Sequence, residues 1–306
     1  MLCLGLMRGD SSIFDYNEKE MQKVLFYGFV IFPILFFIGC SGNQVDKDGG
    51  DLLRSEVEVL SEKMSEAVEK EFPLLKHKFV NRYVDALGQS IVARNPDMPP
   101  LPYEFRLLKN NETFVFSLPG GVVYLTLGTL RSVELEGQLA AAIAHELAHQ
   151  QLNHYLVMWR KKVNGNRNSN RNLLDFSGEW RARFLGENGA IVLGNAAEEE
   201  ADRLAPVILY KAGFDPRLYV SYLEILQSLK MNSPEQVREM LSIQPPTEAR
   251  IKWAKEIISS LPPLKDPIVS SSTFKEVKAM LLDAEKKVDK KDEKKNKKQT
   301  SKKVTQ

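Results

Sequence analysis

Apolar residues recur at helical spacing over much of the chain. Near the start, five of them stand three or four positions apart and predict an amphipathic helix at about 52–71. A similar pattern predicts a second helix at about 74–94, ended by the proline-rich stretch 96–102. Further helices are predicted at about 134–158, 195–211 and 216–230, with shorter helical pieces at 235–240 and 247–261.

Between the second and third of these helices, the pattern changes to an alternation of apolar and polar residues, which is typical of strands. Short strands are predicted around 103–107, 114–116 and 122–127, and a turn at Pro119-Gly120-Gly121 separates the last two. The sequence therefore predicts an α+β fold that is mainly helical, with a small β-sheet beside the helix at 134–158.

The N-terminal segment carries an apolar run at 24–38, which is 15 residues long. A membrane-spanning helix needs roughly 20 such residues, whereas the apolar core of a secretory signal has about 7–15. The run ends in Phe37-Ile38-Gly39-Cys40, which resembles the cleavage box of bacterial lipoproteins. We therefore expect a signal segment at 1–39 with Met21 as the true start. A lipidated tether at 40–51 would begin at Cys40.

This anchor predicts where the protein works. A lipoprotein starting at Cys40 would face the periplasm, and Ser41 as the next residue favours the outer membrane. The alternative is an uncleaved signal anchor, which likewise places the domain outside the cytoplasm. Both interpretations predict a protein of the cell envelope that is held at a membrane.

The charge distribution divides the rest of the chain. A net charge of only +2 gives no reason to expect a nucleic-acid partner. The segment 285–306 holds 10 Lys against 4 acidic residues, which is typical of a disordered, solvated tail; a tail that binds a membrane surface or a partner is the alternative. We expect one domain at 52–262 and a C-terminal extension at 263–306.

A His-Glu-x-x-His pattern stands inside the predicted helix at 134–158, as His145-Glu146-Leu147-Ala148-His149. Residues four apart lie on one helix face, so both imidazoles can reach a single Zn²⁺ ion at ~2.0–2.1 Å. The carboxylate of Glu146 can reach a water on that metal and take its proton. Two other interpretations stay open: a pair of histidines with structural hydrogen bonds, and a metal with a purely structural role.

The other histidines do not complete the site by their spacing. His154 lies about two and a half turns beyond His145, so we expect it on the opposite helix face as a packing or capping residue. His77, in an early amphipathic helix, is expected at the surface. The longer metzincin motif is excluded, because it needs Gly and His where Leu152 and Tyr155 stand.

A catalytic zinc ion usually has three protein ligands, so a carboxylate from another helix is expected. The acidic cluster at 198–202 is the best source. Its alternative interpretation is a solvated helix start, which acidic residues favour through the helix dipole.

The zinc motif and the segment Glu198-Glu199-Glu200-Ala201-Asp202-Arg203 together resemble the family of membrane-associated gluzincin zinc metallopeptidases that contains the CAAX prenyl endopeptidase, HtpX, BepA and LoiP. Segments at 117–124, 212–216 and 245–251 also resemble that family, so the resemblance covers roughly 55–260. It implies a zincin-like fold at 52–262, one zinc ion per chain and hydrolysis of peptide bonds.

The resemblance also implies roles for individual residues. His145, His149 and Glu198 would be the zinc ligands, Glu146 the catalytic base, and Asp202 the carboxylate that orients a zinc-binding histidine. Glu198 and Asp202 are four residues apart, so one helix face can present both.

Substrate contacts are implied in the same way. An edge strand near Pro119, Gly120 and Gly121 would receive an extended polypeptide. Gln244 stands where the family often has a histidine that contacts the transition state or gates the site, and Arg250 is a further candidate for that contact. Pro206 departs from the family pattern because it removes a helical N–H one turn after Asp202.

The short, lipid-anchored form is closest to LoiP-like lipoproteins within that family. We therefore expect an endopeptidase that degrades misfolded or misassembled envelope proteins. One alternative is a zinc-binding chaperone or adaptor lipoprotein that cuts little. Another is a structural lipoprotein with an accidental motif, which would bind no stoichiometric zinc.

Overall fold

The structure is a computed structural model that describes residues 54–158, 193–232 and 247–283. The N-terminal segment with Cys40, the predicted helical piece at 235–240, Gln244 and the Lys-rich tail lie outside the described residues. The predictions for those segments therefore stay predictions.

A three-stranded sheet lies at the centre of the described residues. It consists of β1 (Glu104–Leu108), β2 (Val115–Ser117) and β3 (Val122–Thr126) in the order β1-β3-β2. β3 runs parallel to β1 and antiparallel to β2. The turn between β2 and β3 contains Gly120 and Gly121 at φ 93° and 102°, a region that glycine adopts without strain. The predicted α+β class with a small sheet is confirmed.

Helices cover both faces of this sheet, and the central strand β3 is buried along its whole length. On one face, α2 (Arg54–Glu71) packs Leu60, Met64 and Val68 against Tyr124 and its neighbours. The other face meets α3 (Lys78–Ala93) and α5 (Glu136–Gln151), whose apolar residues form the main core with strand side chains. A short helix, α4 (Leu127–Ser132), follows β3 directly.

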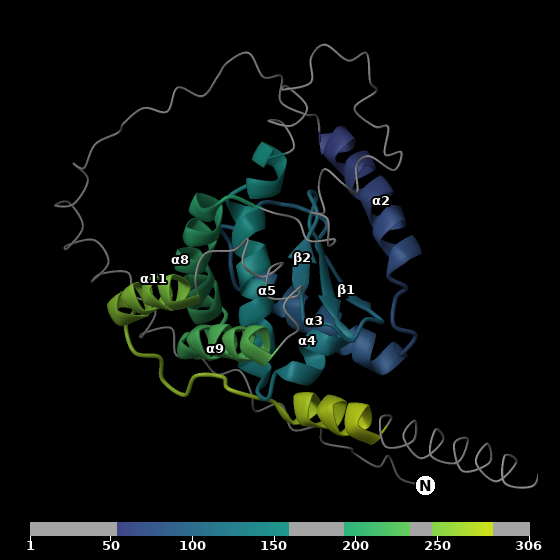
Figure 1. Cartoon of the computed structure of the whole chain (residues 1–306). Coiled ribbons are helices and arrows are strands. Elements are labelled where there is room, and N and C mark those ends of the chain that lie inside the picture. Colours follow the sequence, from purple (N-terminus) through teal and green to yellow (C-terminus); the bar gives the residue numbers. More distant parts are fainter. Residues whose placement is uncertain (1–53, 159–192, 233–246, 284–306) are drawn as a thin grey trace, which may run out of the picture. The chain divides into compact units, whose positions relative to one another are not determined.

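Helix α5 lies between the sheet and a group of three helices (Figure 1). These are α8 (Asn195–Lys211), α9 (Arg217–Asn232) and α11 (Thr247–Ser260). Small residues make this close packing possible: a Cβ atom on Gly137 would lie 2.1 Å from Cδ1 of Leu218 in α9. Pro206 does not end α8, which continues to Lys211.

The predicted helix at 134–158 is interrupted in the structure, so its C-terminal part was predicted wrongly. α5 ends at Gln151, and Asn153 has a positive φ of 56° that redirects the chain. Residues 154–158 are helical again after this turn. Asn tolerates the left-handed region better than most residues because its short polar side chain bonds locally. The interruption changes where every side chain after Gln151 points.

A helix at 272–283, which was not predicted from the sequence, packs into the main core. Its residues Phe274, Val277 and Leu281 are all buried there. Lys278 donates to the carbonyl oxygens of Leu130, Arg131 and Val133 at the end of α4, at 3.3, 2.7 and 2.7 Å. The segment after residue 262 thus supplies part of the same hydrophobic core.

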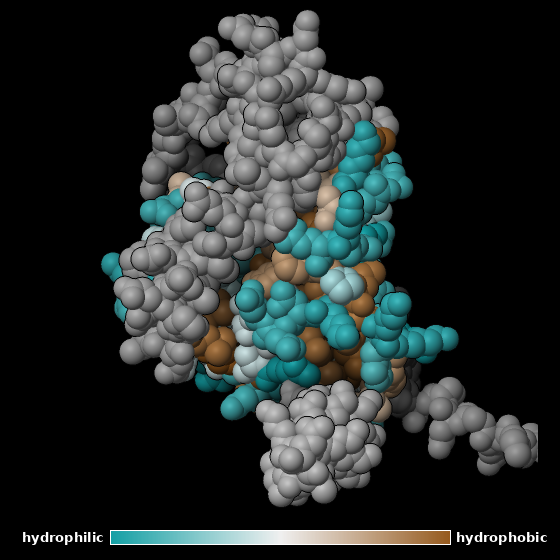
Figure 2. Space-filling model, turned by 45° about the vertical axis from the view of Figure 1, so that its right-hand side comes forward, coloured by the Kyte–Doolittle hydropathy of each residue, from teal (hydrophilic) through white to brown (hydrophobic). Residues whose placement is uncertain are grey.

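The described surface mixes hydrophilic and apolar side chains, as the face in Figure 2 shows. Exposed large apolar residues come from separate segments, for example Val59, Phe79 and Leu282, and such scattered exposure is normal for a folded protein. Among the described helices, none combines the length and the apolar character needed to span a bilayer.

Candidate metal centre

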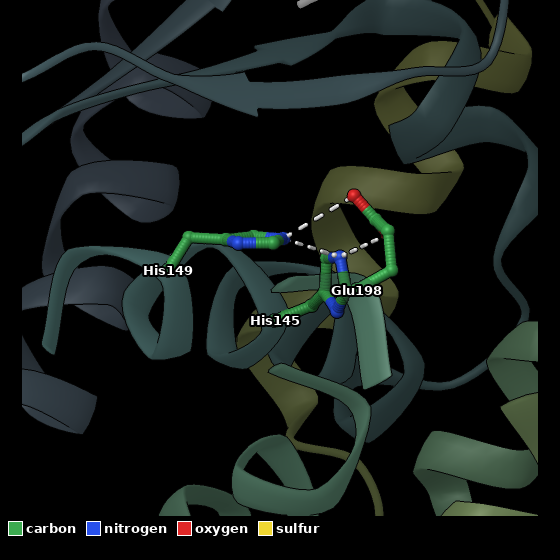
Figure 3. Close-up of side chains that lie close together, drawn as sticks. All are labelled: His145, His149 and Glu198. Atoms are coloured by element: carbon green, nitrogen blue, oxygen red, sulfur yellow. Dashed lines mark hydrogen bonds and ion pairs between the residues drawn. The ribbon is translucent and has the colours of Figure 1, made fainter. Parts of the chain in front are cut away.

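Three potential ligands meet where α5 faces the start of α8. His145 and His149 lie one turn apart on α5, and Glu198 reaches them from the first turn of α8 (Figure 3). The Nε2 atoms of the two histidines are 3.0 Å apart, and Glu198 oxygens lie 3.5 Å from Nε2 of His145 and 3.7 Å from Nε2 of His149. Their ligand atoms all lie within 4.8 Å of one another.

The group has the character of a cation site. All three side chains are buried, and Oε2 of Glu198 has no hydrogen-bond donor among the described residues. Burial lowers the pKa of His145, but hydrogen bonds to Asp202 and Glu198 outweigh it and raise that pKa to about 9. Burial lowers the pKa of His149 well below its usual range, so this imidazole is neutral and can bind a metal. Two imidazoles with one carboxylate are the donor set of a catalytic zinc site. The residues present fit a zinc ion.

Two groups fix the orientation of the His145 ring from its far side. The Tyr219 hydroxyl lies 2.9 Å from Nδ1 of His145 and donates to Oδ1 of Asp202, which itself is 3.3 Å from that Nδ1. With Asp202 as the acceptor, Nδ1 carries the proton and Nε2 keeps its lone pair for a metal. Asp202 therefore lies where it can orient the His145 ring, and its role in metal binding stays a prediction.

Arg250 from α11 holds Asp202 ionised. Its Nε and one terminal nitrogen each donate to Asp202, both at 2.8 Å, in the bidentate arrangement that suits a carboxylate. Burial would raise the pKa of Asp202, but the Arg250 charge and the bonds from His145 and Arg250 hold it well below its usual range. Arg250 is itself buried and lies 3.7 Å from Oε2 of Glu198. Its predicted contact with substrate stays a prediction.

The side chain of Glu146 points toward β2 of the sheet, and not toward Asp202 and Tyr219, which contact His145. One of its oxygens accepts hydrogen bonds from the Ser117 hydroxyl on β2 at 2.9 Å and from the Tyr155 hydroxyl at 2.7 Å. Burial raises the pKa of Glu146, while the charge of His145 and the bonds from Tyr155 and Ser117 act in the opposite direction. A carboxylate with a raised pKa is suited to accept a proton at neutral pH.

His154 lies against His149, so the prediction that it points to the opposite face is wrong. Its Nδ1 atom is 2.8 Å from Nδ1 of His149. The prediction assumed a continuous helix, and the turn at Asn153 brings the His154 ring back toward the site. His154 is not part of the group of three possible metal ligands. His77, predicted at the surface, caps α3 by accepting from the Val80 amide at 3.4 Å.

The predicted substrate contacts at the β2–β3 turn adjoin this centre. Pro119 and Gly120 line a cavity of about 210 Å³ together with His149, Tyr155 and Leu156. Gly121 follows in the same turn, and its added Cβ would meet Leu101 at 3.2 Å. Within the described sheet, β2 has a neighbouring strand on one side only.

Ser117, Tyr155 and Tyr219 contact the functional residues but were not assigned roles from the sequence. A hydroxyl on a strand or helix carries no spacing signal, so only the fold reveals that it faces a carboxylate. For Tyr219 the sequence offered one hint, its position soon after the turn at 213–216, but nothing specified its partner.

Two histidines one turn apart on a helix, a glutamate between them and a carboxylate from a second helix define a metallopeptidase site of the gluzincin type. The profile of peptidase family M48 matches residues 79–258. This match covers more than half of the chain, which therefore belongs to peptidase family M48.

Individual proteins that are similar to this chain also carry the names of proteases. The chain is 26% identical to a beta-barrel assembly-enhancing protease of Yersinia pestis over 227 residues, 69% of this chain and 45% of that protein. The protein of the same name from Escherichia coli (strain K12) is also 26% identical, over 237 residues with the same coverage. A mitochondrial metalloendopeptidase of Schizosaccharomyces pombe is 29% identical over 136 residues, 44% of this chain and 40% of that protein. The chain spans less than half the length of these relatives.

Proposed function

We propose that this protein is a zinc-dependent endopeptidase of the bacterial cell envelope. The observation that carries this proposal is the buried group of His145, His149 and Glu198, with the carboxylate of Glu146 on the same helix. Membership of peptidase family M48 supports it. A bound zinc ion would supply the Lewis acidity that activates water and polarises a carbonyl group.

The protein groups divide the remaining work. Glu146 takes a proton from the attacking water and can pass it to the departing amine. Ser117 and Tyr155 donate to one of its oxygens, which keeps the carboxylate in one rotamer. Asp202 and Tyr219 hold the ring of His145, so that its Nε2 atom faces His149 and Glu198, where these residues would hold the ion.

The surroundings of the site favour an extended polypeptide as substrate. An additional strand can pair with the open side of β2, where backbone hydrogen bonds give affinity without sequence specificity. The cavity beside His149 measures about 210 Å³, which exceeds the ~150 Å³ cavity that holds benzene in a protein core. An apolar side chain of the substrate would fit there. Pro119 and Gly120 would border it.

We further propose that the enzyme is lipidated at Cys40, faces the periplasm from the outer membrane, and degrades misfolded or misassembled envelope proteins. Two of the relatives carry the name beta-barrel assembly-enhancing protease, which supports a substrate in the envelope. The closer likeness to LoiP-type lipoproteins also stays part of this proposal. Palmitate labelling that disappears in Cys40→Ala would support the anchor, and labelling that persists would contradict it.

The catalytic proposal is tested by comparing wild type with Glu146→Gln in the digestion of an unfolded protein such as casein. Gln cannot accept the proton, so we expect cleavage to fall by at least the 10²–10⁴-fold that general-base catalysis contributes. Zinc content should stay at one ion per chain. Equal cleavage by both proteins would refute the enzymatic role. Zinc binding without cleavage in either would favour the chaperone-like alternative.

The metal proposal has a separate test. Purified wild type should contain one zinc ion per chain, and His149→Ala should lose it, because two protein ligands hold zinc far less well than three. Elemental analysis of both proteins, alongside His77→Ala as a control histidine at the start of α3, measures this directly. A wild type without stoichiometric zinc would favour the structural lipoprotein with an accidental motif.

A further inference from the structure

A line of polar groups runs from His149 outward, away from the metal-binding point. Nδ1 of His149 lies 2.8 Å from Nδ1 of His154, and Nε2 of His154 lies 3.0 Å from Oε2 of Glu200. The three side chains come from α5, from the helical turn at 154–158 and from α8. His149 and His154 are buried, whereas the side chain of Glu200 is 61% exposed.

The carboxylate at the outer end determines where the protons lie along this line. Glu200 is an acceptor only, so Nε2 of a neutral His154 must carry the hydrogen. Nδ1 of His154 is then an acceptor, and the 2.8 Å contact requires Nδ1 of His149 to donate. Nε2 of His149 is left with its lone pair, and this atom faces His145 and Glu198.

We propose that His154 and Glu200 are positioning residues that hold His149 in its metal-binding tautomer. This inference rests on the proposed zinc site. A ligating histidine needs its second ring nitrogen satisfied by an acceptor, and such partners typically contribute 10–100-fold to metal affinity. His145 receives this support from Asp202 and Tyr219; for His149 the structure assigns it to His154.

The turn at Asn153 makes the contact between His154 and His149 possible. If α5 continued past Gln151, the ring of His154 would project from a different face of the helix. The positive φ of Asn153 ends the helix and turns the ring onto His149, with the two ring centroids 5.1 Å apart. Glu200 is the less critical partner, because water can replace an exposed acceptor. We therefore expect His154 substitutions to have the larger effect.

Amide substitutions separate the positioning role from a merely structural one. In His154→Asn the amide oxygen stands near the place of Nδ1 and can accept from His149, whereas in His154→Gln the amide stands near the place of Nε2. We expect the zinc dissociation constant, measured by competition with a chelator on the full chain, to rise 10–100-fold in His154→Gln. In His154→Asn it should stay within about threefold of wild type.

Charge reversal at the outer end gives an independent test. A lysine at position 200 would donate to Nε2 of His154, move the hydrogen of that ring to Nδ1, and force His149 to carry its proton on the metal side. Glu200→Lys should therefore weaken zinc binding about tenfold more than Glu199→Lys. Glu199 is a matched control because it stands on the same helix turn but pairs with Arg203 at 3.0 Å.

The outcomes distinguish this inference from the proposed function. A wild type that binds no stoichiometric zinc overturns both. A wild type that binds zinc, together with equal affinities for His154→Asn and His154→Gln, or for Glu200→Lys and Glu199→Lys, overturns only the positioning role. The unfolding midpoint of each metal-free variant is recorded alongside, and a lower midpoint with unchanged zinc affinity also overturns it.

Discussion

At the scale of single residues, hydroxyl groups contact the carboxylates of the candidate site. Ser117 and Tyr155 both donate to the same oxygen of Glu146, although they come from a strand and from the turn of helix after α5. Each donor stabilises the ionised carboxylate against the cost of its burial. The ionised form is the one that accepts a proton, so these donors set the pH at which the proposed base becomes active.

Tyr155→Phe should therefore raise the pKa of Glu146 further. The acid limb of the pH profile of kcat/KM reports the free enzyme's base, so it should move to higher pH. Tyr103→Phe is a matched control, because the buried Tyr103 hydroxyl has no partner among the described residues. Its profile should match wild type. An acid limb that moves equally in both variants would contradict the role assigned to Tyr155.

The sequence predicted the three residues that meet at the candidate metal centre better than it predicted the residues that contact them. The i, i+4 spacing of His145 and His149 places both on one face whatever surrounds them. The resemblance to a known family supplied Glu198 as the expected third ligand, and the structure brings it close to both histidines. His154 was misplaced because apolar periodicity continues past Gln151 and hides the turn at Asn153. A single left-handed residue leaves little trace in periodicity.

At the scale of elements, the position of the site depends on how closely α5 can approach its neighbours. The run Ala140–Ala144 is buried almost completely, and a Cβ on Gly137 would meet Leu218 of α9 at 2.1 Å and the Val269 carbonyl oxygen at 3.4 Å. Larger side chains here would push α9 away, and with it Tyr219, which anchors His145. Small residues on α5 thus connect packing to the orientation of a proposed metal ligand.

Gly137→Ala should lower the free energy of unfolding by about 1–3 kcal/mol, because overpacking a tight contact forces side chains off their rotamers. The gain in helix propensity from Ala, at most ~1 kcal/mol, offsets part of this cost. Chemical denaturation measures the change. In the double variant Gly137→Ala/Leu218→Ala the two changes in unfolding free energy should be non-additive. The space left by the shortened Leu218 side chain accepts the new methyl group at position 137. Strict additivity would show that the two residues do not compete for this space.

The same scale shows what spacing could and could not predict among the elements. The helices α2, α3 and α8 agree closely with the predicted ranges 52–71, 74–94 and 195–211, since each has an apolar stripe at helical spacing. The three predicted strands are also present. The helix at 272–283 was missed even though Phe274, Val277 and Leu281 stand three and four residues apart. The charged residues that dominate its continuation obscured this short stripe.

At the scale of the whole molecule, the C-terminal segment contributes to the core that holds the site. The Ser271 hydroxyl donates to Glu136 at 2.8 Å, and the Tyr83 hydroxyl donates to the same oxygen at 2.9 Å. Phe274 is 1% exposed and packs beside Tyr83. The start of α5 is thus secured by a segment that follows the predicted domain boundary at 262.

A chain truncated after Pro262 should therefore be markedly less stable than the full chain. Loss of Phe274 alone typically costs about 3–5 kcal/mol when a buried Phe is reduced to Ala. The full chain with Phe274→Ala gives the matched comparison, and a chain ending after Asp283 removes only the Lys-rich tail. Thermal unfolding of the three proteins distinguishes the cases. Equal midpoints for the Pro262 truncation and the full chain would support the domain boundary predicted at 262.

Glu198 and Asp202 stand on adjacent turns of α8, with one facing the metal position and the other supporting His145. A shift of this helix along its axis would withdraw both side chains together, so the proposed third ligand and one of the two groups that hold the His145 ring would be lost in the same movement. Displacement of α8 would therefore dismantle the proposed metal centre as a whole. Intermediate activity of the proposed enzyme would reflect a mixture of molecules with an intact centre and molecules without one.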